Sequence, residues 1–324
     1  MDFRLTDDQR ALRAGTRELL ARVWPPEALR EALERPGTLD RALWRALGDA
    51  GFFALRLPEE RGGVGLGAVA AVVVFEEAGR VLLPGPLVAT HLAAGVIEGA
   101  ADGERVVTRV DGGLVPWLDA ADHVLGDATG AVPLRSVDPL TPLHRVPGPG
   151  TPDPSPRPLT APDPCARPLT AADSYAALAP LTAPDPYAAL LTAAEQLGSA
   201  DRTTAMAVRY AKEREQFGRP IGAFQAVQHL CAEMLVRTEL ARAAVYAAAV
   251  TEDVTEIAGA KLLADDAAVR NARDCLQAYG GMGFTWEADV HPHLKRAWVR
   301  ARMWPTATEA EEIQAEALRI APLP

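Results

Sequence analysis

One short segment of the chain groups three side chains whose chemistry suits an anionic, planar ligand. Arg214 offers a guanidinium fork, Phe217 an aromatic face and Gln225 a carboxamide. A guanidinium binds carboxylates and phosphates through paired hydrogen bonds, and an aromatic ring stacks on a flat ligand. The same residues also fit a plain helix hairpin in which Arg214 pairs with Glu213 or Glu215. The residues alone leave both interpretations open.

A second segment follows a long helical stretch and is rich in glycine. Gln277 precedes Gly280 and Gly281, and Gly283 lies shortly after them. Glycine lets the phosphates of a ligand approach bare backbone N–H groups, and an amide at a helix end adds a donor. Alternatively, Gly280 and Gly281 serve only as the C-terminal cap of the helix. The spacing therefore predicts either a phosphate-binding loop or a simple helix end.

Residue types that hold metals or act as nucleophiles are few and scattered. His291 and His293 flank a proline, and no third ligand is clustered with them. We therefore expect a surface pair at a helix start rather than a metal site. Cys231 and Cys275 fall on apolar helical faces, which predicts packing roles. The sequence predicts no metal centre.

The composition excludes several classes of protein. The 324 residues are 48% hydrophobic, and 33 Lys and Arg face 43 Asp and Glu, for a formal net charge of -10. Such a field repels nucleic acid. Three widely spaced cysteines indicate a reducing compartment, and neither a signal peptide nor an apolar run of about 20 residues is present. We expect a cytoplasmic protein with no membrane or nucleic-acid partner.

The elements that must position these groups begin with an N-terminal helical domain over residues 1–100. Thr6, followed by acidic residues, predicts the N-cap of a helix that ends near Val23, before two prolines. Apolar spacing predicts further helices over 39–50 and 68–81.

Residues 101–186 predict a reduced β segment and a proline-rich linker. The alternating stretches 105–110 and 123–126 are typical of short strands around a turn at Gly112 and Gly113. Fifteen of the 27 prolines lie between residues 131 and 186. Because proline removes a backbone donor and restricts the preceding residue, we expect an extended linker or surface segment there.

Residues 187–324 predict an antiparallel four-helix bundle, so the fold class is mainly α. No proline lies between Pro220 and Pro292, and helical apolar spacing continues throughout. Trp286 and Trp298 are expected as core or interface aromatics. The expected helices cover 188–213, 223–250, 254–279 and 288–317.

Taken together, the two ligand-binding segments make the sequence resemble the acyl-CoA dehydrogenase family. The resemblance lies in the residues and in the separation of two stretches, REQFGRPIGAFQAVQH (214–229) and QAYGGMGFTWE (277–287). The opening MDFRLTDDQ and the stretch 57–65 are also similar to that family. The resemblance covers roughly residues 1–100 and 187–300. Its details look most like the actinobacterial branch associated with sterol and polyketide-like acyl chains.

The resemblance implies an N-terminal helical domain, a middle β-domain and a C-terminal four-helix bundle, with FAD bound between subunits. By matched position, a set of residues would contact the dinucleotide of a neighbouring subunit: Arg214, Phe217, Gln225, Gln277, Gly280 and Gly281. It also implies an acyl thioester of CoA or a carrier protein as substrate. The assembly would be a homo-oligomer, or a hetero-oligomer with a second acyl-CoA dehydrogenase-like chain.

Two departures from the family pattern affect catalysis. The threonine- and serine-rich pattern that holds the flavin ring in the family has no counterpart between residues 103 and 131. Aligning the chain's end places Thr308 where the family's catalytic glutamate belongs. Glu309, one position on, and Glu195 are the weak alternatives, so the sequence leaves the base unknown.

Three hypotheses follow. The chain is an active FAD-dependent dehydrogenase subunit, a non-catalytic subunit that lends half of an FAD site, or a flavin-free biosynthetic descendant. The shortened middle segment favours the last two over a self-sufficient enzyme.

Overall fold

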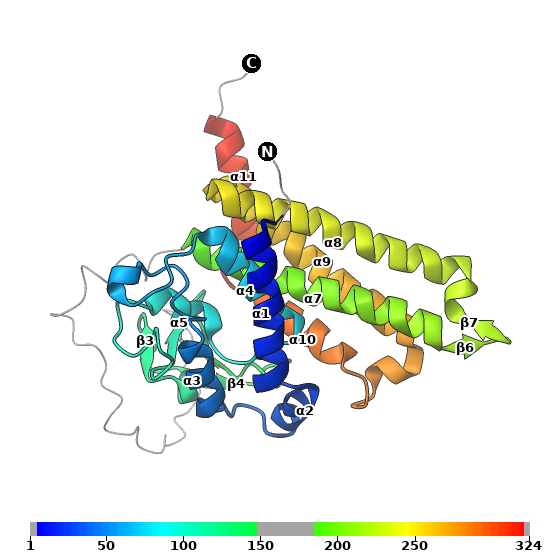
Figure 1. Cartoon of the computed structure of the whole chain (residues 1–324), viewed down its shortest axis with the longest axis horizontal. Coiled ribbons are helices and arrows are strands. Elements are labelled where there is room, and N and C mark those ends of the chain that lie inside the picture. The colour runs from blue at the N-terminus through cyan, green and yellow to red at the C-terminus, as the bar shows by residue number, and fades with distance from the viewer. Residues whose placement is uncertain (1–4, 148–184, 321–324) are drawn as a thin grey trace. The chain divides into compact units, whose positions relative to one another are not determined.

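The computed structural model describes residues 5–147 and 185–320. Contacts divide the chain into two compact units, described separately below. The bundle unit comprises Met1–Pro25, Gly67–Leu83 and Pro186–Pro324, and the small unit comprises Pro26–Leu66 and Pro84–Asp185. The fold is mainly α, as predicted (Figure 1). The three-domain division drawn from the sequence stays a prediction.

The bundle unit is built of long helices. Its members are α1 (Asp7–Val23), α4 (Ala68–Arg80), α7 (Pro186–Glu213), α8 (Gln225–Thr251), α9 (Val254–Tyr279), α10 (Val290–Arg300) and α11 (Ala307–Ile320). Helices α7, α8 and α9 pack on one another, α4 packs on α7, and α10 and α11 pack on α9. The C-terminal helix bundle is therefore confirmed. Within the described ranges, no helix combines the length and apolar character needed to cross a bilayer.

Helix α1 begins where the sequence predicts. The Thr6 hydroxyl accepts a hydrogen bond from the Gln9 backbone N–H, and the Gln9 side chain accepts one from the Thr6 N–H. This reciprocal capping box satisfies two donors that a helix start leaves open. At the other end, the Trp24 indole donates to the Val81 carbonyl over 3.1 Å.

Two glycines allow α4 and α7 to cross closely. A Cβ atom on Gly198 would lie 1.8 Å from the Glu76 carbonyl oxygen, and one on Gly79 would lie 2.0 Å from the Glu195 carbonyl oxygen. Neither position tolerates a side chain while the backbones stay in place. The crossing therefore requires glycine on both helices.

Glu76 connects three helices of the bundle unit. Its carboxylate accepts hydrogen bonds from Arg13 of α1 over 2.8 Å, from the Tyr246 hydroxyl of α8 over 2.6 Å, and from Arg242 of α8. The neighbouring Glu77 pairs with Arg17 over 2.8 Å. Because both carboxylates are buried, these partners satisfy charges that would otherwise destabilise the fold.

The fourth predicted helix is divided, so the expectation of one helix over 288–317 is wrong. Helix α10 ends at Arg300 and α11 begins at Ala307. Pro305 has no backbone N–H to donate, and Trp304 adopts a φ of 58°, outside the helical region. These two residues interrupt the helical hydrogen bonds.

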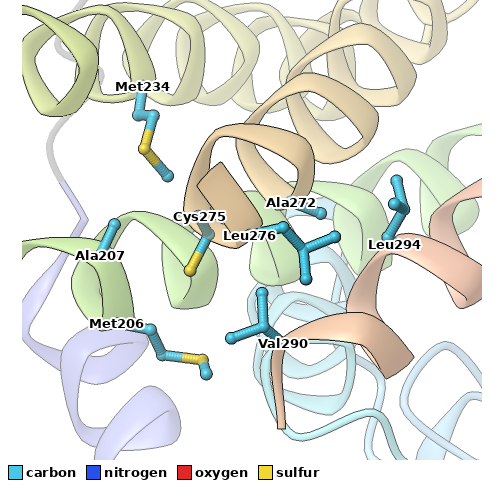
Figure 2. Close-up of a cluster of buried hydrophobic side chains, with 8 residues drawn as sticks. All are labelled: Met206, Ala207, Met234, Ala272, Cys275, Leu276, Val290 and Leu294. Carbon is cyan, nitrogen blue, oxygen red and sulfur yellow. The ribbon is translucent and has the colours of Figure 1, made fainter. Parts of the chain in front are cut away.

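Sulfur-containing and aliphatic side chains form a core between the helices of the bundle unit. Figure 2 shows its buried members: Met206, Ala207, Met234, Ala272, Cys275, Leu276, Val290 and Leu294. Cys231 is half-buried against this cluster. Both cysteines of the bundle are thus packing residues, as expected.

One face of α8 is apolar and exposed. Val236 is 57% exposed, Leu240 56% and Val250 52%, and the small residues Ala243 and Ala247 lie between them at helical spacing. We call these five residues the α8 row. A surface helix normally shows polar residues on its outer side, so the α8 row is a departure from that pattern.

The small unit combines short helices with short strands. Its helices are α2 (Pro26–Glu34), α3 (Arg41–Asp49) and α5 (Leu87–Ala93), with one-turn segments at Glu59–Arg61 and Leu118–Ala120. Trp44 of α3 contacts Phe53 with ring centroids 4.6 Å apart. The helices over 39–50 and 68–81 were predicted, whereas α2 and α5 were not.

Five strands of three residues each cover the described part of the middle segment. Strand β1 (Val107–Arg109) pairs in parallel with β3 (His123–Leu125). The antiparallel sheet has the order β2 (Leu114–Pro116), β5 (Leu143–Arg145), β4 (Val132–Leu134). The reduced β segment is therefore confirmed over residues 101–147.

The stretches 105–110 and 123–126, predicted as short strands around the Gly112–Gly113 turn, do pair with each other, but they are not the two arms of that turn. That turn leads from β1 into β2, which joins the other sheet, so β3 returns parallel to β1. Pro116 and Pro133 both lie on edge strands, where a missing donor is tolerated. The predicted proline-rich linker falls mostly on 148–184, outside the described residues.

Candidate functional site

The two segments singled out from the sequence meet at one end of the bundle unit (Figure 1). Helix α7 ends at Glu213 and α9 ends at Tyr279. The rings of Tyr210 and Tyr279 stack with centroids 4.0 Å apart and planes 15° apart. The ends of the two helices are therefore in direct contact, and the structure brings the two segments together.

The segment after α7 forms a minimal hairpin. Its strands are β6 (Glu215–Gln216) and β7 (Arg219–Pro220), joined by Phe217 and Gly218 at φ values of 53° and 74°. Two positive φ values are what a tight two-residue hairpin turn requires. The Phe217 ring is 91% exposed. An aromatic ring held at such a turn tip is available for contact with a ligand or another chain.

The backbone of Arg214 is held by two hydrogen bonds, and its guanidinium group is exposed. Its N–H donates to the Tyr210 carbonyl and its carbonyl accepts from the Ile221 N–H, both over 2.8 Å. Over the described ranges its exposed guanidinium forms no ion pair with Glu213 or Glu215. The connection between α7 and α8 is thus a hairpin, as the plain interpretation expects, but the expected pair is not found in it.

Gln225 is the first residue of α8, and its side chain is exposed. Arg219 lies over the ring of Phe224, with its guanidinium carbon 4.3 Å from the ring centroid. Phe224 also makes an edge contact with Phe217, with centroids 6.1 Å apart. Sequence reasoning missed Phe224 as a partner of Phe217 and Arg219 as a partner of Phe224, although both lie in the quoted motif.

The segment after α9 has two glycines with different roles. Gly280 adopts a φ of 59° and its N–H donates to the Gln277 carbonyl, so it does cap the helix. A Cβ atom on Gly281 would meet nothing within 4 Å, so internal packing does not require a glycine there. Gln277 is exposed in the last turn of α9. Capping thus explains Gly280 and leaves Gly281 unexplained.

Glu309 is engaged at the start of α11. Its carboxylate accepts hydrogen bonds from the Thr306 N–H over 2.8 Å and from the Thr306 hydroxyl over 2.7 Å. These bonds favour the charged form and hold the pKa of Glu309 below its usual value. The geometry is that of a capping box.

Glu195 lies in the interior of the bundle unit. It is 5% exposed, and its carboxylate accepts a hydrogen bond from Arg300 over 2.6 Å. Burial raises the pKa of Glu195, and the positive charge of Arg300 opposes that shift. Both weak candidates for the base are therefore held by other groups.

The expected surface pair of histidines is buried, so that expectation is wrong. His291 and His293 are 8% and 3% exposed, in the first turn of α10. His293 Nδ1 lies 2.8 Å from the Ser199 hydroxyl, and burial lowers the pKa of His293 to about 3. The described residues contain no cluster able to hold a metal ion.

The two tryptophans near these histidines are not core residues. Trp286 is 66% exposed and Trp298 is 40% exposed. The ring of Trp286 makes an edge contact with His291, with centroids 4.7 Å apart. The alternative role at an interface stays a prediction.

Comparison with known proteins decides the family. The family model for the acyl-CoA dehydrogenase N-terminal domain matches residues 6–104, and the model for the C-terminal domain matches residues 186–320. The chain is 36% identical over 319 residues to acyl-CoA dehydrogenase IpdE2 of Mycobacterium tuberculosis, covering 92% of this chain and 93% of that one. The chain belongs to the acyl-CoA dehydrogenase family.

A second mycobacterial relative supports the expected actinobacterial branch. Acyl-CoA dehydrogenase FadE34 of Mycobacterium tuberculosis is 36% identical over 299 residues, which cover 79% of this chain and 39% of FadE34. Among solved structures, a chain of the ChsE4-ChsE5 complex from Mycobacterium tuberculosis matches with a TM-score of 0.78 at 24% identity. The match covers 100% of this chain and 100% of that chain. That likeness shows the acyl-CoA dehydrogenase fold.

The predicted resemblance is thus confirmed at the level of family and fold. FAD-dependent dehydrogenation of acyl thioesters is general in acyl-CoA dehydrogenases.

Proposed function

We propose that this chain is one subunit of an FAD-dependent acyl-CoA dehydrogenase acting on an acyl thioester of CoA or of a carrier protein. The observation that carries the proposal is the contact between Tyr210 and Tyr279. It brings the two segments predicted from the sequence side by side, and the polar groups of those segments are exposed. The acyl group itself, and the sterol or polyketide character expected for it, stay predictions.

The exposed groups fit the adenosine and pyrophosphate part of FAD. Arg214 offers an uncompensated fork for phosphate oxygens, and Gly281 offers an open stretch of backbone. Gln225 and Gln277 supply carboxamides, and Phe217 supplies a flat ring. Gly280 fixes the direction of the chain before Gly281. Each group is of the type that a dinucleotide requires.

The same features favour a half-site over a complete one. The described middle strands are three residues long, and the family's pattern for holding the flavin ring has no counterpart between residues 103 and 131. When bound, FAD would accept the hydride that leaves the β-carbon of the substrate. Glu309 and Glu195 are occupied by Thr306 and Arg300. We therefore propose that a carboxylate of a partner chain removes the α-proton.

The partner we propose is a second acyl-CoA dehydrogenase-like chain, because the similar ChsE4-ChsE5 structure is a complex of two chains. A homo-oligomer is the alternative. The free thiols Cys231 and Cys275 fit a reducing compartment, so we place the protein in the cytoplasm.

The test measures flavin retention. The chain is purified alone and with a co-expressed acyl-CoA dehydrogenase-like partner, and flavin absorbance is recorded after gel filtration. We expect flavin in the complex only. Arg214→Ala removes a charge-assisted contact and should weaken FAD binding by about ten- to a hundredfold. Arg35→Ala is the matched control, because Arg35 is exposed and, among the residues that the structure describes, its side chain pairs with the exposed Glu31 alone.

Each alternative has its own outcome. Flavin bound by the chain alone would indicate a self-sufficient enzyme. Absence of flavin from every complex would favour a flavin-free descendant. Equal flavin content in Arg214→Ala and in the unmodified complex would show that Arg214 has no role in binding it.

A further inference from the structure

The stacked pair Tyr210 and Tyr279 is joined directly to both ligand-binding segments. The Tyr210 carbonyl accepts the N–H of Arg214 over 2.8 Å, so this tyrosine is part of the turn that fixes Arg214. Tyr279 is the last residue of α9 and immediately precedes Gly280. A Cβ atom on Gly283 would lie 3.0 Å from the Tyr279 Cβ, so the glycine loop folds back on this tyrosine. Each ring therefore belongs to one segment and touches the other ring.

One side of the pair is anchored in the core. Tyr279 packs against the buried cluster that contains Cys275 and Leu276. The positive charge of Arg209, next to Tyr210, opposes the rise that burial gives to the pKa of Tyr279. A ring contact and an electrostatic interaction therefore connect the ends of α7 and α9.

The positions of these rings have a consequence for ligand binding. Tyr210 and Tyr279 are 69 positions apart in the sequence. The covalent chain between the two segments therefore does not by itself fix the distance between them. A ligand that contacts both must pay the entropy of fixing that spacing unless the protein has already fixed it. The packing of Met206 and Ala207 on Cys275 and Leu276 holds the two helices together, and the stack extends this contact to the helix ends that carry the segments.

We infer that Tyr210 and Tyr279 are positioning residues that hold Arg214 and the Gly280–Gly281 backbone at the spacing of one dinucleotide. The inference rests on the proposed function, since it assumes that the two segments bind one ligand. The rings act through the segments and make no contact with the ligand. Because the ring pair stabilises the spacing that the ligand needs, its loss should weaken the affinity for FAD.

The test uses the co-expressed complex and measures the dissociation constant for FAD by titrating the flavin-depleted complex. Tyr210→Leu should weaken binding about three- to tenfold, which corresponds to the loss of one aromatic pair. Tyr210→Phe keeps the ring and should bind like the unmodified complex. Tyr210 lies outside the residues packed on the core cluster, so its replacement leaves that cluster intact. Tyr279→Leu should weaken binding at least as much, because Tyr279 also packs against that cluster.

A second measurement separates positioning from general stability. Amide hydrogen exchange without FAD should become faster in 214–222 and in 280–284 for Tyr210→Leu, while exchange in the middle of α8 stays unchanged. A double-mutant cycle compares Tyr210→Leu in the unmodified complex and in Arg214→Ala. Tyr210→Leu should weaken FAD binding much less in Arg214→Ala, because the Arg214 side chain whose position Tyr210 holds is then already absent.

The outcomes distinguish this inference from the proposed function. If Tyr210→Leu and Tyr279→Leu bind FAD normally while Arg214→Ala is weakened, the positioning role is wrong and the FAD half-site stands. If Arg214→Ala also binds normally, the proposed half-site itself is wrong. If Tyr210→Phe loses as much affinity as Tyr210→Leu, the hydroxyl rather than the ring stack is responsible, and the inference is overturned.

Discussion

The Glu195 carboxylate and the Arg300 guanidinium form an ion pair with a distance of 2.6 Å in the interior of the bundle unit. The two residues are 5% and 6% exposed and lie on α7 and α10. A buried carboxylate in an acyl-CoA dehydrogenase invites a catalytic interpretation, but this one is occupied by a cation. Its role in the structure is to tie two helices together.

Glu195→Gln should therefore destabilise the fold rather than stop the chemistry. Removing one partner leaves the buried Arg300 charge without its carboxylate and should lower the free energy of unfolding by about 3 kcal/mol. Urea denaturation measures the loss, with the exposed Glu311→Gln as the control. A dehydrogenation rate that falls to background in correctly folded complex would instead identify Glu195 as the base.

Glu309→Ala tests the other candidate. The substitution removes the acceptor for the Thr306 N–H and hydroxyl and should lower stability by about 1 kcal/mol, as loss of a capping contact does. Because we assign no proton transfer to Glu309, the rate of flavin reduction by substrate should be unchanged in the complex. Rapid-reaction absorbance provides that rate, and a large decrease would contradict the cap as its sole role.

The buried histidines predict a loss of stability in mild acid. The pKa of His293 is lowered to about 3 and the pKa of His91 to about 4, both by burial. The unfolded chain, with an ordinary histidine pKa near 6.5, then binds more protons than the native chain between pH 6.5 and about 4. Stability is therefore full above pH 6.5 and decreases as the pH falls through that window.

His293→Gln isolates one of these contributions. Between pH 7 and pH 5 the unfolding free energy of the variant should fall by about 2 kcal/mol less than that of the unmodified protein. Chemical denaturation at several pH values gives both curves. Parallel curves would mean that His293 titrates normally in the native state.

Substitution of glycine by alanine should have opposite effects at the close crossing of α4 and α7 and at an open position of α1. Gly198→Ala would place a methyl group 1.8 Å from the Glu76 carbonyl oxygen and should lower stability by about 3 kcal/mol through forced displacement of α4. Gly15→Ala in α1 meets nothing within 4 Å and should raise stability by about 0.5–1 kcal/mol. Thermal unfolding of the pair is a matched comparison. Equal melting temperatures would show that the crossing is not tight.

The sequence predicted what local patterns determine. Thr6 and Gln9 cap α1 as expected, and the limits of α9 agree with the prediction because apolar spacing and helix ends are local signals. The interrupted fourth helix was missed although Pro305 is visible in the sequence. The apolar residues on either side of that break continue the helical spacing and concealed it.

Contacts between distant segments were not predictable in the same way. Nothing near Glu195 in the sequence points to Arg300, and nothing near His293 points to Ser199. These pairs exist because whole helices pack in one arrangement. Tyr279 does stand in the quoted segment 277–287, and Tyr210 lies one helical turn before Arg214; that proximity to candidate ligand-binding residues is the signal that could have identified them.

The α8 row also matters for how such a protein is produced. The folded chain has an apolar strip in contact with water along one helix, formed by Val236, Leu240 and Val250. Strips of this kind promote colloidal self-association as concentration rises. A solution of the uncovered chain is therefore expected to scatter more light, as its concentration rises, than a solution of a protein whose outward helix faces are polar.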